Sequence, residues 1–203
     1  MTWIKTIAAK DATGRLKNIY DRISGPDGNI DNILMAHSLR PHTLEGHMTL
    51  YKYVLHHPKN TLDKWFLEAI GTYVSHLNGC EYCFEHHYHG MARLVGDKAK
   101  AMKIRAAIEE GTVETLADFS NREQAALTYA KALTVNPNGM NEQSVAKLRD
   151  AGLNDGEILE VNQVVAYFAY ANRTVQGLGI STEGDIIGLS PNDSDDPDNW
   201  SHS

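Results

Sequence analysis

The chain has little positive charge and no long hydrophobic run. Its 203 residues include 19 Lys and Arg against 26 Asp and Glu, which gives a formal net charge of −7. Proteins that bind nucleic acid neutralise phosphates with a basic surface, so this balance argues against a nucleic-acid partner. No stretch reaches the roughly 18 consecutive apolar residues of a transmembrane helix, and the first residues lack a signal-peptide pattern. We therefore expect a cytoplasmic protein with no membrane partner.

Basic residues are missing altogether from the C-terminal part of the chain. No Lys or Arg follows Arg173, whereas six acidic residues do. Residues 189–203 consist mainly of Pro, Asp, Ser and Asn, a composition typical of mobile segments. We predict a single helical domain over residues 1–188, with its core over about 30–180, and an acidic flexible tail over 189–203. The six acidic residues are Glu183, Asp185, Asp193, Asp195, Asp196 and Asp198.

Strand patterns are almost absent, and helical periodicity takes their place. Between residues 62 and 77 the apolar side chains recur at intervals of three and four, which is the spacing of one helix face. Ser120 followed by Glu123 has the pattern of a capping box, and Asn141 and Asn154 precede two further helical segments. The sequence predicts an all-α fold with helices over 12–24, 31–39, 41–56, 62–78, 80–94, 97–109, 121–134, 142–151 and 155–177.

Cysteine is scarce, and both cysteines belong to one C-E-Y-C motif over residues 80–83. In a reducing compartment so short a loop is an unlikely place for a structural disulfide, because it would stabilise little. Residues three apart in a helix lie at bridging distance, which suits a bond that forms and breaks. A thioredoxin-type site needs strands, and haem attachment needs His where this chain has Phe84. Zinc bound by the cysteines and two histidines is an alternative, although His86 and His87 point to different helix faces.

His87 extends the cysteine motif. Cys80, Cys83 and His87 stand at i, i+3 and i+7, so they form one stripe on a helix. The thiolate is the nucleophilic form, and at the ordinary pKa of about 8.5 only about 3% of a thiol is ionised at neutral pH. A neighbouring base and the positive end of the helix dipole raise that fraction. The stripe is therefore a candidate thiol redox site.

Glu68 belongs to the helix that precedes the cysteines. Its neighbours on the same face are small, namely Gly71, Thr72 and Ser75, so another helix can approach closely. The cysteine helix follows after a short turn and is the natural partner. We expect Glu68 to meet His87 there, as a carboxylate that orients an imidazole.

The other histidines have structural interpretations. We expect His37, His42 and His47 to line a surface or a subunit contact. His56 and His57 stand at a predicted helix end, where a cation suits the dipole.

Four of these residues together resemble a known family. Glu68, Cys80, Cys83 and His87 match the E-x11-C-x-x-C-x-x-x-H pattern of the alkylhydroperoxidase D-like (AhpD-like) proteins, within the carboxymuconolactone decarboxylase superfamily. The resemblance covers residues 30–135, extends to about 180, and is to the peroxidase-related branch. It implies a compact all-α domain that carries the C-x-x-C motif on a helix hairpin.

The resemblance also implies residue roles. Cys83 resembles the peroxidatic cysteine, which attacks a hydroperoxide, and Cys80 resembles the resolving cysteine, which closes the disulfide. His87 and Glu68 resemble a proton relay that deprotonates Cys83. The founding members carry a second histidine just before the peroxidatic cysteine, whereas this chain has Tyr82, whose phenol is a poor general base.

These expectations lead to a predicted function. The chain resembles a cofactor-free thiol peroxidase or disulfide oxidoreductase that holds no metal, reduces hydroperoxides and is recycled by an unidentified thiol or lipoyl-type reductant. The resemblance also implies a homo-oligomer, a trimer or a hexamer. One alternative is a metal-binding or redox-sensing interaction protein that uses the same Cys/His cluster. Another is a lactone decarboxylase-like enzyme, from a branch that generally lacks the C-x-x-C motif.

Overall fold

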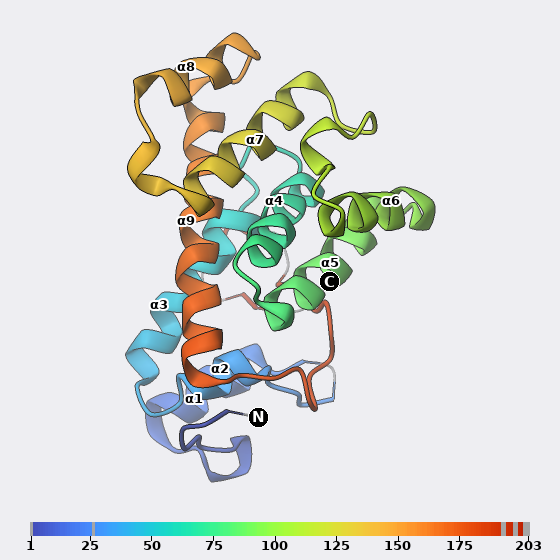
Figure 1. Cartoon of the computed structure of the whole chain (residues 1–203). Helices are drawn as coiled ribbons and strands as arrows, with labels where there is room; N and C mark the ends of the chain where they lie inside the picture. The colour runs from blue at the N-terminus through green and yellow to red at the C-terminus, as the bar shows by residue number, and fades with distance from the viewer. Residues whose placement is uncertain (1, 26, 192–193, 197–198, 201–203) are drawn as a thin grey trace.

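The structure is a computed structural model that describes residues 2–25, 27–191, 194–196 and 199–200. Within these residues the chain is helical, with no strand longer than an isolated bridge residue at Pro191, which confirms the predicted all-α fold (Figure 1). In the described part of the chain, one short 3-10 turn precedes α1, and two more and a π-helix lie between later α-helices. The helices are α1 (Gly14–Ile23), α2 (Asn32–Ala36), α3 (Pro41–Tyr51), α4 (Lys64–Leu77), α5 (Glu81–Val95), α6 (Lys98–Glu109), α7 (Asn121–Val135), α8 (Glu142–Asp150) and α9 (Asp155–Leu178).

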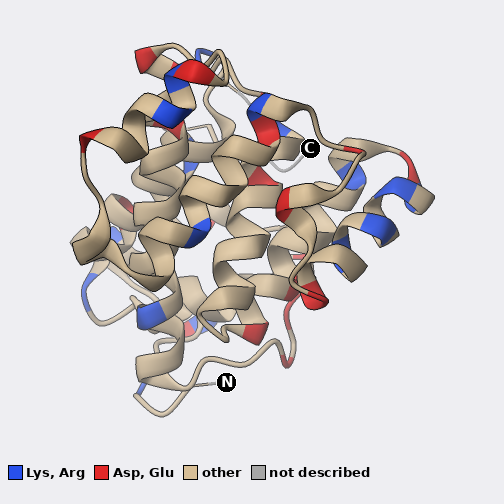
Figure 2. Ribbon diagram, turned by 45° about the horizontal axis from the view of Figure 1, so that its top comes forward, with Lys and Arg blue, Asp and Glu red and all other residues tan. Residues whose placement is uncertain are grey.

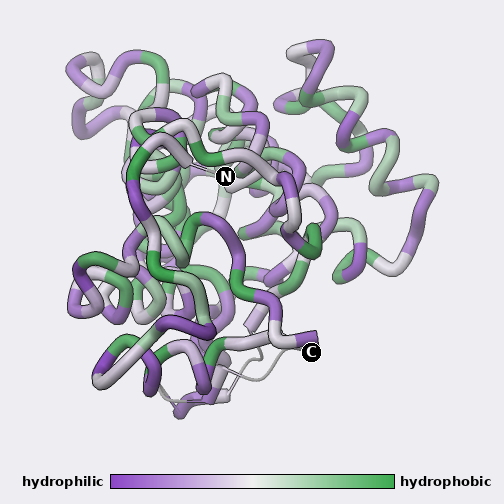
Figure 3. Tube along the Cα trace, turned by 90° about the horizontal axis from the view of Figure 1, so that it is seen from below, coloured by the Kyte–Doolittle hydropathy of each residue, from purple (hydrophilic) through white to green (hydrophobic). Residues whose placement is uncertain are grey.

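Helix α4 is the central element. Every residue from Phe66 to Ser75 is buried, because α4 packs against α5, α6, α7 and α9 (Figure 1). Along the chain, hydrophobic and hydrophilic residues alternate around the helices, and charged residues lie mainly at the periphery of the bundle (Figures 2 and 3). Glu68 is an exception, since this carboxylate lies in the middle of the most buried helix. None of the helices within the described residues is both long and apolar enough to cross a membrane.

Several helix ends follow the chemistry expected of them. Ser120, Asn141 and Asn154 each accept backbone hydrogen bonds at the start of α7, α8 and α9, as predicted.

The start of α4 differs from the prediction, because the helix begins at Lys64. The N–H and the hydroxyl of Thr61 instead bind the Glu160 carboxylate of α9, at 2.9 and 3.0 Å. Thr61 therefore ties the loop to α9 and does not cap α4.

The predicted helix over residues 41–56 changes its geometry halfway. Helix α3 ends at Tyr51, and Lys52–His56 form a π-helix, a rare conformation that occurs often at functional sites. The wider turn buries two basic side chains, Lys52 and His56. The Lys52 ammonium donates to the carbonyls of Asp196 and Asn199, each at 2.6 Å, and such acceptors are what a buried cation requires.

The segment after α9 crosses the lower end of the bundle and returns to α5 (Figure 1). Within the predicted tail, residues 192–193, 197–198 and 201–203 lie outside the described residues. Parts of the described remainder are packed: Trp200 is 8% exposed and joins a second core cluster with α1 and α3. Asp195, Asp196 and Asn199 are exposed. Arg93 of α5 donates to the Gly188 carbonyl just before the tail. Contacts with Lys52 and with the second core, which no local composition signals, thus hold Trp200 and the backbone carbonyls of Asp196 and Asn199.

A close approach between α4 and α9 depends on Gly71. A Cβ atom at this position would lie 2.1 Å from Cε2 of Phe168, far inside contact distance. The Phe168 ring fills the space above the glycine and is fully buried. Gly71 therefore sets the distance between α4 and α9.

We expect Gly71→Ala to destabilise the protein, because overpacking of a filled core typically costs about 1–3 kcal/mol. Gly177→Ala on α9 is the matched control. A Cβ atom there meets nothing within 4 Å, so relief of glycine's conformational entropy should stabilise the helix by about 0.5–1 kcal/mol. Urea denaturation of both variants measures the difference. Equal midpoints for the two variants would contradict the packing described.

Candidate active site

The two cysteines stand at the start of α5. Gly79 adopts a left-handed conformation (φ 67°) that turns the chain sharply from α4 into α5. Cys80 is the N-cap residue of α5, and Cys83 lies one turn further on. Both are buried free thiols, and their Sγ atoms are 2.7 Å apart. The two cysteines therefore lie close together, as predicted, on the hairpin formed by α4 and α5.

The two thiols influence each other's ionisation. Burial raises the pKa of Cys83 well above its ordinary value, and the adjacent Cys80 sulfur raises it further. The hydrogen bond with Cys83 lowers the pKa of Cys80. In this arrangement the first proton leaves from Cys80, and the remaining proton stays on Cys83. The family resemblance implies ionisation at Cys83 instead, so the Cys83 proton would need an acceptor, which the predicted relay assigns to His87.

Glu68 and His87 meet as the sequence predicts. The Oε2 atom of Glu68 lies 2.6 Å from Nδ1 of His87, and the carboxylate is completely buried. Burial alone would raise the pKa of Glu68, but the charges and hydrogen bonds of His87 and His56 outweigh it and hold the pKa at about 2. The carboxylate is thus ionised and orients the imidazole through Nδ1, which leaves Nε2 for chemistry.

His56 is a second partner of Glu68 that the sequence interpretation missed. Its Nε2 atom lies 3.1 Å from Oε1 of Glu68, and its side chain is 4% exposed. His56 stands at a helix end, as predicted, but it is buried there and faces Glu68, because the π-helix turns this side chain inward. The ring of Tyr51 packs edge-on against both His56 and His87. Glu68 consequently holds two histidines from different elements.

A second buried carboxylate, that of Asp185, contacts side chains of the cysteine helix α5. The Tyr82 hydroxyl donates to Oδ2 of Asp185 at 2.6 Å, and Nε2 of His86 lies 3.4 Å from the same oxygen. The Asn32 N–H donates to both Asp185 oxygens. The hydroxyl proton of Tyr82 is therefore engaged with Asp185. No spacing pattern signals this cluster, since it depends on the path of the chain after α9.

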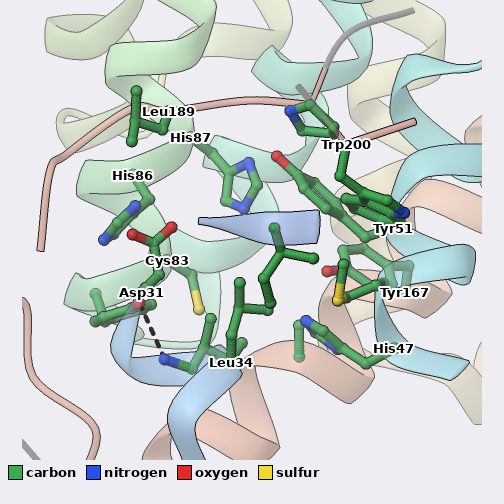
Figure 4. Close-up of a pocket in the computed structure, with 16 residues that line it drawn as sticks. Asp31, Leu34, His47, Tyr51, Cys83, His86, His87, Tyr167, Leu189 and Trp200 are labelled. Atoms are coloured by element: carbon green, nitrogen blue, oxygen red, sulfur yellow. Dashed lines mark hydrogen bonds between the residues drawn. The ribbon is translucent and has the colours of Figure 1, made fainter. Parts of the chain in front are cut away.

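A partly open cavity of about 70 Å³ is bordered by Cys83, His87, Tyr51 and Tyr82, whereas Glu68, His56 and Asp185 lie behind its walls (Figure 4). Cys83 and His87 project into it from α5, and Tyr51, Tyr167 and Trp200 form an aromatic wall opposite (Figure 4). A single water needs about 10–15 Å³ of such space, so the cavity exceeds one water several-fold. None of the described residues that line it is Lys or Arg. They are Ile23, Asp31, Ile33, Leu34, His47, Met48, Tyr51, Tyr82, Cys83, His86, His87, Tyr167, Ala171, Leu189, Pro191 and Trp200.

His47 is the polar residue on the far wall of the cavity (Figure 4). It is 4% exposed, so the expected surface position is wrong. Burial, together with His37 and His87, lowers its pKa to about 3, which keeps the imidazole neutral. Its Nδ1 atom is buried and forms no hydrogen bond with any described residue. Its place three residues after Leu44, on the face that also carries Met48 and Tyr51, is a helical pattern that could have revealed its burial.

The chemistry that this arrangement supports is thiol chemistry. Within the described part of the chain, no group of three or more His, Cys, Asp or Glu side chains is arranged to hold a metal ion. The site instead combines a pair of adjacent thiols, an imidazole oriented by a buried carboxylate, and an apolar cavity that reaches Cys83.

Comparison with solved structures finds the same fold in several proteins. One is the AhpD core of an uncharacterized peroxidase-related protein from Ralstonia eutropha JMP134, with a TM-score of 0.75 and 18% identity over 89% of this chain and 91% of that chain. A peroxidase-related protein from Silicibacter sp. TM1040 has a TM-score of 0.66 and 24% identity over 76% and 77%. The debrominase Bmp8 has a TM-score of 0.69 and 20% identity over 87% and 89%.

These likenesses show an AhpD-like fold and confirm the fold expected from the resemblance. Neither a family model nor a curated protein matches the chain. The roles of Glu68, Cys80, Cys83 and His87, the cytoplasmic location and the homo-oligomer stay predictions.

We expect Glu68→Gln to reduce the acid sensitivity of the fold. The folded pKa of Glu68, about 2, lies below the ordinary 4.5, so the unfolded chain binds this proton first. The carboxylate stabilises the protein above about pH 4.5, and that contribution is lost as the pH falls towards 2. Urea midpoints at pH 7 and pH 3 should therefore differ less in Glu68→Gln than in the wild type. The exposed Glu142→Gln should behave as wild type, and equal pH dependence in all three proteins would contradict the pairing.

Proposed function

We propose that this protein is a cofactor-free thiol peroxidase in which Cys83 attacks a hydroperoxide and Cys80 resolves the product. The observation that carries the proposal is that Cys83 and His87 line one apolar cavity, while the Cys80 sulfur stands 2.7 Å from that of Cys83. Cys83 is preferred as the nucleophile because it lines this cavity and Cys80 does not. A substrate in the cavity thus meets Cys83 first.

The first half of the reaction forms a sulfenic acid. The His87 imidazole, oriented by Glu68, takes the Cys83 proton and becomes an imidazolium, and the Cys83 thiolate then attacks the terminal peroxide oxygen. The S–O bond forms as the O–O bond breaks, and the departing alkoxide takes a proton from the His87 imidazolium that Glu68 stabilises. The products are an alcohol and a sulfenic acid on Cys83. The low-dielectric surroundings of Glu68, which is 0% exposed, strengthen its hold on the imidazolium.

The second half forms the disulfide. The Cys80 sulfur attacks the sulfenic sulfur of Cys83, and the hydroxyl leaves as water with the proton that Cys80 carried. One hydroperoxide is reduced by two electrons, and the two thiols become one disulfide. Because the sulfur atoms already lie within a turn of each other, this step requires little movement of α5.

The cavity favours a compact, uncharged organic hydroperoxide. Its space exceeds that of a few-atom solute such as hydrogen peroxide, and its walls are mainly aromatic and aliphatic. A neutral His47 forms a hydrogen bond but no ion pair, and no Lys or Arg among the described residues lines the cavity. An anionic substrate would therefore meet the His87 imidazole as a cation, and the charge of His87 is already balanced by Glu68. Each buried CH2 group of the substrate contributes about 0.8 kcal/mol, so an alkyl or aryl arm should raise kcat/KM.

A second candidate function is reductive dehalogenation of a small heteroaromatic ring. The aromatic wall and the neutral His47 opposite Cys83 favour it. A cysteine-to-alanine variant of the debrominase Bmp8, in complex with 2,3,4-tribromopyrrole, has the same fold at 19% identity. In this case the Cys83 thiolate takes the halogen, the ring carbon takes a proton, and Cys80 expels the halide to give the same disulfide. Assays of peroxide consumption and of bromide release distinguish the two functions.

We expect the two cysteine variants to fail in different ways. Cys83→Ser should abolish hydroperoxide consumption, because it removes the nucleophile. Cys80→Ser should complete one turnover and leave a sulfenic acid that dimedone traps on Cys83. His87→Asn should slow the oxidation by about 10²–10⁴-fold, since proton transfer is lost and the nucleophile is kept. Mass spectrometry and stopped-flow kinetics measure these outcomes. Retained activity in Cys83→Ser would reverse the assignment.

We expect tert-butyl hydroperoxide to be preferred over hydrogen peroxide, by about 10- to 100-fold in kcat/KM, because its arm is buried in the cavity. Trp200→Ala should reduce this preference and leave the rate with hydrogen peroxide nearly unchanged, since Trp200 forms part of the aromatic wall. Trp3→Ala is the matched control, because Trp3 is 80% exposed and lies outside the cavity. A preference that survives Trp200→Ala would place the substrate elsewhere.

A further inference from the structure

We propose that the reductant reaches the cysteine pair from the side opposite to the peroxide, through a charged hollow at Cys80 that disfavours thiols with anionic substituents. The inference rests on the proposed function and extends it, because the oxidised pair has to be reduced after each turnover. It concerns only the second half of the cycle, which can be measured separately from the first.

The geometry that carries the proposal is the position of the pair between two hollows. The cavity described above reaches Cys83. A second, more open hollow of about 380 Å³ reaches Cys80, between the end of α4, the start of α5 and the end of α6. Neither cysteine lines both hollows within the described residues. The second hollow is lined by Ser75, His76, Gly79, Cys80, Glu81, Phe84, Glu85, Arg105 and Glu109.

The two hollows differ in polarity. The Cys80 hollow carries three carboxylates against the single guanidinium of Arg105. That guanidinium is already engaged, since it binds Glu85 at 2.6 and 3.1 Å and Glu109 at 2.8 Å. Glu81, directly beside Cys80, is exposed and forms no ion pair with any described residue. An incoming thiol therefore meets excess negative charge next to the sulfur that it has to attack.

A separate entrance for the reductant follows from the cost of desolvation. Thiolates are the reducing species, and a charged thiolate that entered the mainly apolar cavity would lose hydration there. The His87 imidazole in that cavity offsets little of this loss, because its charge is already balanced by Glu68. None of the described residues of that cavity is Lys or Arg. The Cys80 hollow is open to water, so a thiolate keeps much of its hydration as it approaches.

The reduction balances as two thiol exchanges. A reductant thiolate attacks Cys80 Sγ, the S–S bond breaks, and Cys83 leaves as a thiolate. A second reductant thiolate, or the second sulfur of a dithiol, then attacks the mixed disulfide. The products are the oxidised reductant and a Cys80 thiolate, so two electrons pass to the protein. Cys83 is thereby released on the side of the cavity where the next hydroperoxide binds.

The first experiment asks whether one entrance serves both halves of the cycle. The disulfide is prepared with diamide, and its reduction by 2-mercaptoethanol is followed with and without 2-phenyl-2-propanol. The alcohol is used at a concentration that slows oxidation by cumene hydroperoxide fivefold. We expect the reduction rate to change less than twofold. An equal slowing of both halves would overturn the proposal, because it would show that the reductant needs the same cavity.

The second experiment measures charge selectivity. Reduction rates, expressed per thiolate, are compared for cysteamine, 2-mercaptoethanol and 3-mercaptopropionate at low salt. We expect them to fall in that order and to converge at high salt. A unit charge about 7 Å away in water changes a rate about 2.7-fold. Because cysteamine and 3-mercaptopropionate differ by two charges, Glu81→Gln should lower their rate ratio about sevenfold. The remote Glu142→Gln should keep the wild-type ratio.

Failure of the inference and failure of the proposed function look different. If hydroperoxides do not oxidise the pair, the proposed function is wrong, but the diamide-made disulfide still reports how thiols approach. If the pair is oxidised rapidly yet 3-mercaptopropionate reduces it as fast per thiolate as cysteamine, the charged entrance at Cys80 is wrong while the peroxidase proposal stands.

Discussion

The buried carboxylate of Glu68 is the constraint on which the rest of the site depends. A completely buried charge is tolerated only when it is paired and hydrogen-bonded. Glu68 obtains its partners from two different elements, His87 on α5 and His56 on the π-helix. Three elements must therefore keep one mutual position for the charge to be tolerated. The same pairing fixes the His87 imidazole beside the cavity. The contact that makes the buried Glu68 charge tolerable is therefore also the contact that orients this imidazole.

Small residues make this arrangement sterically feasible. Gly71 lets Phe168 lie against α4, and Phe168 in turn packs edge-on against His87, with ring centroids 4.5 Å apart. Gly90 of α5 lies over the Glu68 carboxylate, where a Cβ atom would sit 3.7 Å from it. The backbones of α4 and α5 can thus come close around the charge and exclude water. Exclusion of water strengthens the hold of the carboxylate on the imidazole.

The sequence predicts the parts of the site that follow from local periodicity and misses those that follow from the path of the chain. The all-α fold, the adjacent cysteines and the Glu68–His87 contact come from helical spacing and small neighbours. His56 is missed because it lies in a π-helix, where its side chain points in a different direction from the one that a continuous α-helix would give it. Asp185 and Trp200 follow α9 in a stretch without helical periodicity, so only tertiary contacts place them. Asp185 contacts Tyr82, and Trp200 contacts Lys52 and lines the cavity.

The helix hairpin also explains why a single pair of sulfur atoms can face two environments. Cys80 caps α5 at the turn, where solvent reaches the ends of three helices, whereas Cys83 lies one turn deeper against α9 and the C-terminal segment. A three-residue spacing is the shortest that places two helix-borne sulfurs within bonding distance. Both sulfur atoms are buried, yet Cys80 borders the hollow at the turn and Cys83 borders the mainly apolar cavity. In the proposed cycle, electrons pass from one hollow to the other through one S–S bond, with no opening of the core.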